Sequence, residues 1–197
     1  LMITTLFLDE LFFVLSCPVI VAVVPYGELF GFSHTSFETG LRWVFWIVYA
    51  AIFVWTVILF LGIIVKPAAI KNALVFIFRF KPIRRWQPAV VALGDNMVAT
   101  SVELKTRSFR WWLEVFTATA LTWTSRYLVV NALFLGFVPG ADQLVVFGRQ
   151  FVVWVVLMVS PTPGGSGVSE WLFTEYYGDM LHNAGIALVI ALFWRII

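Results

Sequence analysis

Long apolar stretches separated by short polar segments dominate this sequence. Such stretches cover residues of about 6–24, 41–65 and 109–135, and two shorter ones follow at about 144–159 and 185–197. A helix of about 20 apolar residues crosses the roughly 30 Å hydrocarbon core of a bilayer. The pattern therefore predicts an all-α polytopic membrane protein, built as a helical bundle, with these five stretches as its membrane helices.

A basic segment separates the second and third apolar stretches. Residues 66–85 contain six lysines and arginines and no acidic residue. Because cytoplasmic loops carry an excess of Lys and Arg, we expect residues 66–107 to be a cytoplasmic amphipathic segment. A basic segment with aromatic residues can also indicate nucleic-acid binding, but between membrane spans anionic lipid headgroups are the expected partner of residues 66–85. We therefore predict no nucleic-acid partner.

Prolines and glycines interrupt the helical pattern directly after residue 159. Residues 160–170 read SPTPGGSGVSE. Proline has no backbone N–H and stops a helix, while glycine accepts positive φ angles. At membrane depth, such irregular backbone persists only where protein or a water-filled cavity satisfies it. We therefore expect residues 160–178 to form a broken, re-entrant segment that lines a polar cavity inside the bundle. A loop at the membrane surface is the alternative.

This break supplies most of the candidate binding residues. Its glycines and the N-terminus of the following helix offer free N–H groups and a partial positive charge, which suit a lipid phosphate. Glu170 would attract an amine on the same headgroup, or would instead cap its own helix. The predicted substrate-binding residues of the break are Pro161, Pro163, Gly164, Gly165, Ser166, Gly167 and Glu170.

Two arginines inside apolar stretches extend the candidate site. Arg126 lies about 14 Å from the end of its stretch, where an isolated charge costs at least ~2.5–3.5 kcal/mol. It shares a helix face with Thr119 and Thr122, so we expect it to face the bundle interior or a hydrated cavity and to contact an acid or a carbonyl. A purely structural ion pair is the alternative. Arg149, in the first turns of the next stretch, would add a charge-assisted contact to a phosphate.

Asp9 and Glu10 are adjacent acids near the start of the first apolar stretch and are further binding candidates. Neighbouring helix positions point about 100° apart, so at most one of the two readily faces a bundle interior. A position of both acids at headgroup level is the alternative.

The sequence offers no pattern for catalysis or for metal binding. The glycines of the break lack the Lys-Ser/Thr pair of a phosphate-binding loop, and no Ser/His/Asp or Cys/His arrangement is found. His34 has no second ligand at metal-binding spacing. We therefore predict no catalytic residue, no metal and no cofactor.

The composition excludes an ordinary soluble domain. Hydrophobic residues make up 61% of the 197 residues and charged residues only 12%, which is typical of a membrane protein. The single cysteine, Cys17, lies in an apolar stretch and is expected to be a buried thiol. Because the sequence begins at Leu1 and ends at Ile197 within apolar stretches, we expect residues 1–197 to be a single transmembrane domain that is a fragment of a longer chain.

Residues 161–170, PTPGGSGVSE, resemble the P-x-P-G-G-x-G-x-x-E signature of the lysylphosphatidylglycerol synthase transmembrane (flippase-like) family. The acid-bearing residues 5–10, the helix that ends at 122–126 and the terminal residues 192–195 fit the same order. The resemblance implies a multi-pass protein of the bacterial or archaeal cytoplasmic (inner) membrane. In the best-understood members this region moves aminoacylated phospholipid between leaflets, and a separate soluble domain makes that lipid.

Together, the residues and the resemblance lead to one functional hypothesis with two alternatives. The hypothesis is a lipid translocator that moves phospholipid, aminoacylated or not, between leaflets. The alternatives are a membrane enzyme or enzyme subunit acting on polyprenyl-linked sugars or lipids, and a non-transporting scaffold for a partner enzyme. Because no aminoacyl transferase domain is present, we expect no such enzymatic activity. The expected protein partner is either a second copy of this chain or a synthase.

Overall fold

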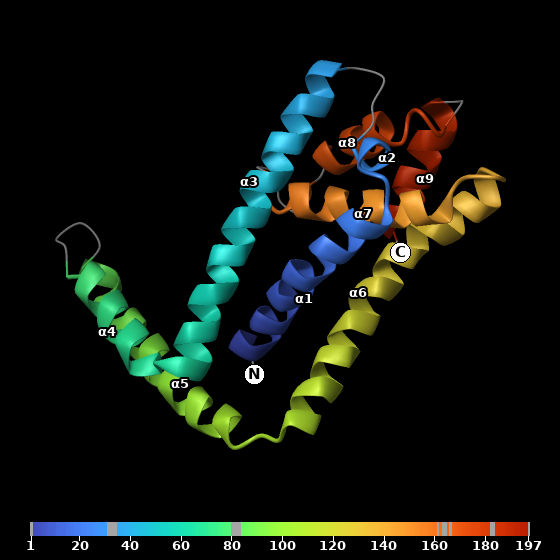
Figure 1. Cartoon of the computed structure of the whole chain (residues 1–197). Helices are drawn as coiled ribbons and strands as arrows, with labels where there is room; N and C mark the ends of the chain where they lie inside the picture. The colour runs from blue at the N-terminus through green and yellow to red at the C-terminus, as the bar shows by residue number, and fades with distance from the viewer. Residues whose placement is uncertain are drawn as a thin grey trace. The chain divides into compact units, whose positions relative to one another are not determined.

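The computed structural model describes residues 2–30, 35–79, 84–160, 162, 165, 167–181 and 184–196. These residues form helices joined by turns and contain no strand, so the all-α prediction is confirmed. Figure 1 shows the helices in chain order. They are α1 (Met2–Val23), α2 (Tyr26–Leu29), α3 (Thr35–Phe60), the π-helical turn η1 (Leu61–Val65), α4 (Pro67–Ile77), the 3-10 turn η2 (Arg84–Trp86), α5 (Gln87–Lys105), α6 (Phe109–Phe137), α7 (Gln143–Leu157), α8 (Val168–Tyr176) and α9 (Ala184–Ile196).

Two of the described helices are long and apolar enough to cross a membrane. They are the Thr4–Val23 part of α1 and the Glu38–Phe60 part of α3. On α3, Trp43 and Ile47 expose 67% and 63% of their surface. Large exposed apolar side chains on a helix are unfavourable in water and favourable in lipid, so this surface fits a membrane environment.

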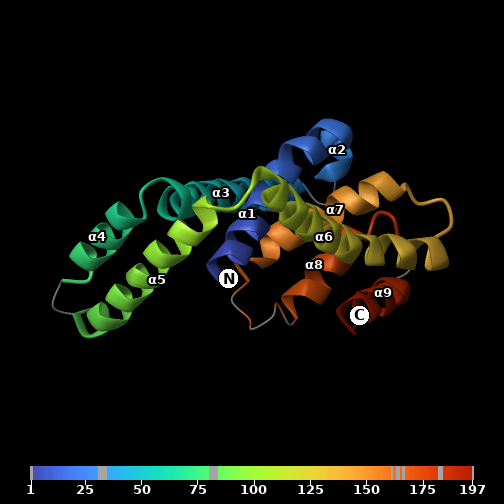
Figure 2. The same cartoon turned by 90° about the horizontal axis from the view of Figure 1, so that it is seen from below.

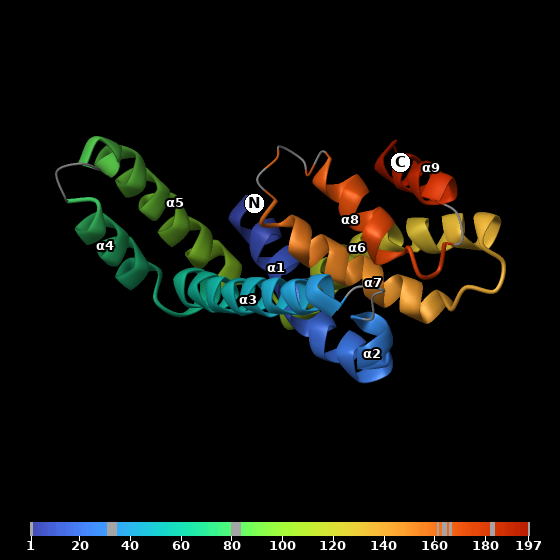
Figure 3. The same ribbon diagram turned by 90° about the horizontal axis from the view of Figure 1, so that it is seen from above.

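The chain forms two compact units, which are described separately. The first comprises Leu1–Val14 and Ile52–Thr119. Its core contains Phe7 and Leu8 of α1, Leu59 of α3 and Leu104 of α5. Helices α4 and α5 lie side by side as a hairpin in Figures 2 and 3, and an ion pair between Lys71 and Asp95 links them. The basic hairpin is therefore held by contacts between its two helices and by contacts of both helices with η1.

The second unit comprises Leu15–Ala51 and Ala120–Ile197. Helix α7 contacts α2 and α8, and α8 contacts α9. Figure 3 shows α7 and α8 side by side. Helix α7 is buried on all sides along most of its length, and its aromatic and aliphatic side chains form the centre of this core together with those of the second half of α6. Burial of this kind is the main stabilising term in a packed unit.

Local sequence explains where α7 begins and where it ends. Asp142 is the N-cap, and its Oδ1 accepts hydrogen bonds from the N–H groups of Leu144 (2.8 Å) and Val145 (3.3 Å). The helix ends at Leu157, and a tight turn follows in which the N–H of Ser160 donates to the Leu157 carbonyl (3.0 Å). The proline-containing break comes directly after this turn, where a helix cannot continue.

Candidate binding cavity

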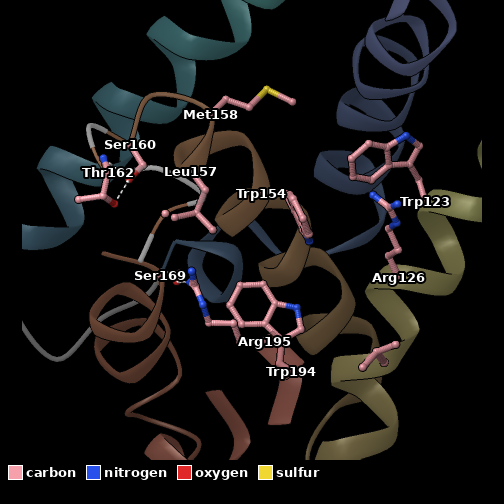
Figure 4. A pocket seen from close by; sticks show the side chains of 12 residues that line it. Trp123, Arg126, Trp154, Leu157, Met158, Ser160, Thr162, Ser169, Trp194 and Arg195 are labelled. Carbon is pink, nitrogen blue, oxygen red and sulfur yellow. Dashed lines mark hydrogen bonds between the residues drawn. The ribbon is translucent and has the colours of Figure 1, made fainter. Parts of the chain in front are cut away.

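A cavity of about 770 Å³ lies within the second unit, beside the break between α7 and α8. Figure 4 shows its lining. Polar and positively charged groups line it together with three indole rings and a few aliphatic side chains. The polar and charged lining residues are Ser160, Thr162, Ser169, Arg126 and Arg195, and the aromatic ones are Trp123, Trp154 and Trp194.

The break contributes its described residues to this lining. Ser160, Thr162 and Gly165 line the cavity, and the hydroxyl oxygens of Ser160 and Thr162 are 3.1 Å apart. Gly165 has a φ of 73°, and its N–H donates to the Thr162 carbonyl (2.9 Å). Positive φ is costly for a residue with a Cβ, so glycine is favoured at this turn. Four of the predicted binding residues, Pro161, Pro163, Gly164 and Ser166, lie outside the described residues.

Glu170 caps helix α8 and pairs with α9. Its Oε2 accepts hydrogen bonds from the Gly167 N–H and from the Ser169 hydroxyl, both at 2.8 Å. Gly167, the N-cap, has a φ of 80° and places its N–H toward this carboxylate. Arg195 of α9 completes the arrangement: its Nη1 is 3.2 Å from Glu170 Oε1 and donates to Ser169 Oγ (2.6 Å). Glu170 is therefore the helix cap and the ion-pair partner of a lining arginine, and is not itself among the lining residues.

Arg126 lines the cavity from α6. Its guanidinium carbon lies 5.0 Å from the centre of the Trp123 ring, a cation–π contact that Figure 4 shows as the arginine turned toward that indole. Among the described residues, no carboxylate or carbonyl is found in an ion pair or hydrogen bond with this guanidinium. Its expected contact with an acid or carbonyl thus remains a prediction.

A buried amide orders two of the three indoles. Gln150 of α7 is fully buried, and with its amide oxygen turned toward the rings it accepts hydrogen bonds from Trp194 Nε1 (3.0 Å) and Trp154 Nε1 (3.2 Å). Trp154 also meets the Trp123 ring edge-on, with ring centres 5.5 Å apart. The aromatic wall is therefore fixed by both polar and ring–ring contacts.

Arg149 occupies a different place from the lining. It is 2% exposed, and both of its terminal nitrogens bind the Asp179 carboxylate at 2.5 and 2.7 Å. Its Nε donates to the Glu28 carbonyl (3.0 Å) and its Nη1 to the Tyr176 carbonyl (2.9 Å). The side chain therefore ties α7 to α2 and to the end of α8, and these contacts use most of its donors.

Asp9 and Glu10 belong to the first unit, whereas the cavity belongs to the second. Both acids are half-buried, and one Glu10 oxygen is buried without a hydrogen-bond partner in the part of the chain that the structure describes. Within those described residues, no group of three or more His, Cys, Asp or Glu side chains is placed to share a metal ion.

Sequence reasoning missed Arg195, Trp154, Trp194 and Gln150 as members of the site. Helical spacing was the available signal. Gln150 and Trp154 are four residues apart on α7 and therefore share a face, and a glutamine inside a largely apolar helix needs a polar partner within the protein. No sequence signal links α7 to α9, because that contact depends on how the helices pack.

The described residues form helices, two of which are long and apolar enough to span a membrane, and an aromatic, positively charged cavity lies beside the broken helix; these features define a helical membrane protein with a candidate ligand site. The comparison with protein families agrees with this class. Residues 2–197 match the model described as the lysylphosphatidylglycerol synthase TM region, so this chain belongs to that family. The resemblance seen in the sequence is thereby confirmed, together with a membrane location and a function related to membrane lipids. The searches of curated proteins and of solved structures gave no match.

Proposed function

We propose that this protein is a flippase-like translocator that moves phospholipid between the leaflets of the bacterial or archaeal cytoplasmic membrane. The observation that carries the proposal is the cavity beside the α7–α8 break, which combines two arginines and three hydroxyl groups with a wall of tryptophans. A phospholipid headgroup needs such polar contacts to leave water, while its acyl tails can remain in the bilayer.

The lining residues suit a headgroup in distinct ways. The guanidinium groups of Arg126 and Arg195 can form charge-assisted hydrogen bonds to a phosphate. The hydroxyls of Ser160 and Thr162 can bind further phosphate or glycerol oxygens. The indoles supply apolar surface against the glycerol backbone and exclude water. Together these groups replace the hydration that the headgroup loses on entry.

The chain is proposed to place the α4–α5 hairpin at the cytoplasmic surface, with residues 66–85 against anionic lipid headgroups. The excess of lysine and arginine supports this orientation. The family model describes a transmembrane region, so the proposal covers lipid movement and leaves the synthesis of an aminoacylated lipid to a separate domain or partner. The proposed protein partner is such a synthase or, alternatively, a second copy of this chain.

Transport can be measured with purified protein in liposomes that contain a headgroup-accessible fluorescent phospholipid. A membrane-impermeant quencher destroys only the outer-leaflet signal, so translocation appears as loss of the protected fraction. We expect Arg126→Gln to reduce the rate by about tenfold, the equivalent of one charge-assisted contact.

Arg110→Gln is the matched control, because Arg110 is also on α6 but is exposed and lies outside the cavity lining, paired with Glu114 one turn away (2.8 Å). It should leave the rate unchanged. A wild-type protein that moves lipid no faster than empty liposomes contradicts the proposed function.

A further inference from the structure

The charge of the cavity has a direct consequence for the lipid that it accepts. Two guanidinium groups line it, those of Arg126 and Arg195, and no carboxylate is among the described lining residues. Unbalanced charge of this kind favours a ligand of opposite sign.

Glu170, an acid in contact with the lining residues Ser169 and Arg195, is already engaged. One of its oxygens accepts from Gly167 and Ser169, and the other faces Arg195 at 3.2 Å. A ligand amine would therefore compete with the helix cap and with the arginine for this carboxylate. The geometry therefore assigns Glu170 to holding Arg195 beside Ser169 and to offsetting its charge.

Arg126 is the cation without such an offset in the described part of the chain. It rests on the Trp123 ring, and in the view of Figure 4 the indoles of Trp154 and Trp194 lie between it and Arg195. With Arg195 and Glu170 balancing each other, the described lining residues keep one net positive charge, and that charge is on Arg126.

We infer that the cavity selects phospholipids whose headgroup carries a net negative charge, that Arg126 binds the phosphate, and that Glu170 is a positioning residue with no part in amine recognition. The inference rests on the proposed lipid-binding role of this cavity. It excludes an aminoacylated, positively charged headgroup as the preferred ligand, because the added amine would meet the unbalanced guanidinium of Arg126 and no carboxylate among the described lining residues.

The test is equilibrium binding to the purified full chain in a neutral detergent, with four short-chain or soluble probes. These are phosphatidylglycerol (anionic), phosphatidylcholine (zwitterionic), lysylphosphatidylglycerol (cationic) and glycerol 3-phosphate, which carries the phosphate without acyl chains. We expect phosphatidylglycerol to bind about tenfold more tightly than the other two lipids, the scale of one charge-assisted contact. Equal affinity for all three lipids overturns the inference.

Three variants assign the roles. Arg126→Gln should reduce the preference for phosphatidylglycerol to within about threefold, and the exposed Arg110→Gln should leave it intact. Glu170→Gln keeps a side chain that can still cap α8, and should leave lysylphosphatidylglycerol affinity unchanged or raise the preference for phosphatidylglycerol. A selective loss of lysylphosphatidylglycerol affinity in Glu170→Gln would show that this carboxylate binds the amine, and would overturn the assignment.

The remaining outcomes separate this inference from the proposed function. Glycerol 3-phosphate binding as tightly as phosphatidylglycerol makes a soluble phosphate ester the ligand and overturns lipid selection. Selective phosphatidylglycerol binding without transport in liposomes supports the inference and contradicts translocation. Transport of all three lipids at equal rates, with equal binding, supports translocation and contradicts charge selection.

Discussion

Arg126 and Arg149 are two arginines in apolar helices whose charges are stabilised by different contacts. Both have to offset the cost of placing a charge away from water. Arg149 does so with a bidentate ion pair to Asp179 and two backbone carbonyls, whereas Arg126 lies over Trp123 at the cavity wall. Sequence spacing located both residues but could not distinguish them, because Asp179 is 30 residues from Arg149 and reaches it only through the packing of α7 and α8.

The contacts of Arg149 predict a mainly structural role. We expect Arg149→Leu to lower the free energy of unfolding by about 3 kcal/mol, because it leaves Asp179 and two carbonyls without their donor. Arg110→Leu is the control: its ion pair with Glu114 is exposed on both sides (87% and 61%) and should contribute less than about 0.5 kcal/mol. Thermal unfolding in detergent measures the difference. Equal melting temperatures for the two variants would show that the Arg149 network adds little stability.

Gln150 predicts a role in ordering the cavity wall. Gln150→Leu is similar in size but removes the acceptor shared by the indole N–H groups of Trp154 and Trp194, and it leaves those two donors unpaired. We expect phosphatidylglycerol affinity to fall by about three- to tenfold. The check is the same binding measurement together with circular dichroism. An unaltered affinity would mean that ring packing alone fixes the wall.

At the scale of elements, α7 organises the second unit through both its sequence and its close contacts. Gly148 lies where α7 meets the end of α1 and α2, and a Cβ added there would be 2.9 Å from Val24 Cγ2 and 3.1 Å from Leu29 Cδ1. Helix interiors otherwise disfavour glycine, so its presence here indicates a requirement for space.

This contact predicts that the same substitution, glycine to alanine, has different effects on stability in α7 and in α6. Gly148→Ala should lower the free energy of unfolding by about 1–3 kcal/mol, because the extra methyl overpacks the junction. Gly136→Ala on α6 meets nothing within 4 Å and should be neutral, or stabilise by a few tenths of a kcal/mol through helix propensity. Unfolding curves decide the matter: a Gly148→Ala variant as stable as Gly136→Ala would show that the junction yields without cost.

Substitutions of the two positive-φ glycines in the break, Gly165 and Gly167, should affect lipid binding differently. Gly165 and Gly167 both have positive φ, but a Cβ at Gly165 would lie 3.4 Å from Leu157 Cδ2, and at Gly167 nothing lies within 4 Å. Both Ala variants should lose about 1 kcal/mol of stability through backbone strain. Gly165→Val should in addition obstruct the turn at the cavity and reduce lipid binding, whereas Gly167→Val should not. If Gly165→Val and Gly167→Val lose lipid binding equally, the cause is backbone strain and not obstruction at the cavity.

At the scale of the whole molecule, hydropathy and charge predicted the fold class and the family motif predicted the family, and both are confirmed. The all-α class could be predicted because apolar stretches and Pro/Gly breaks are local features of the chain. The composition of the cavity could not, since Trp194 and Arg195 come to α7 and α8 only by tertiary packing, and a single sequence carries no signal of that contact.

Orientation across the membrane gives a prediction at this scale. The native thiol, Cys17, is 1% exposed and should not react, so single cysteines can be introduced into the natural sequence. Arg79→Cys, after α4, should react with an impermeant thiol reagent only when the cytoplasmic side is opened. Pro139→Cys, in the turn between α6 and α7, should react from outside intact cells. Labelling of Arg79→Cys from outside would reverse the proposed topology.

The length of α7 has a consequence for the barrier that a headgroup would cross. Fifteen residues make a helix of about 22 Å, about 8 Å shorter than a roughly 30 Å hydrocarbon core. Because the side chains from Val145 to Val155 are buried or half-buried, protein and not lipid encloses this helix along most of its length. A headgroup that enters beside the break would therefore have a shorter apolar distance to cross than in the surrounding bilayer.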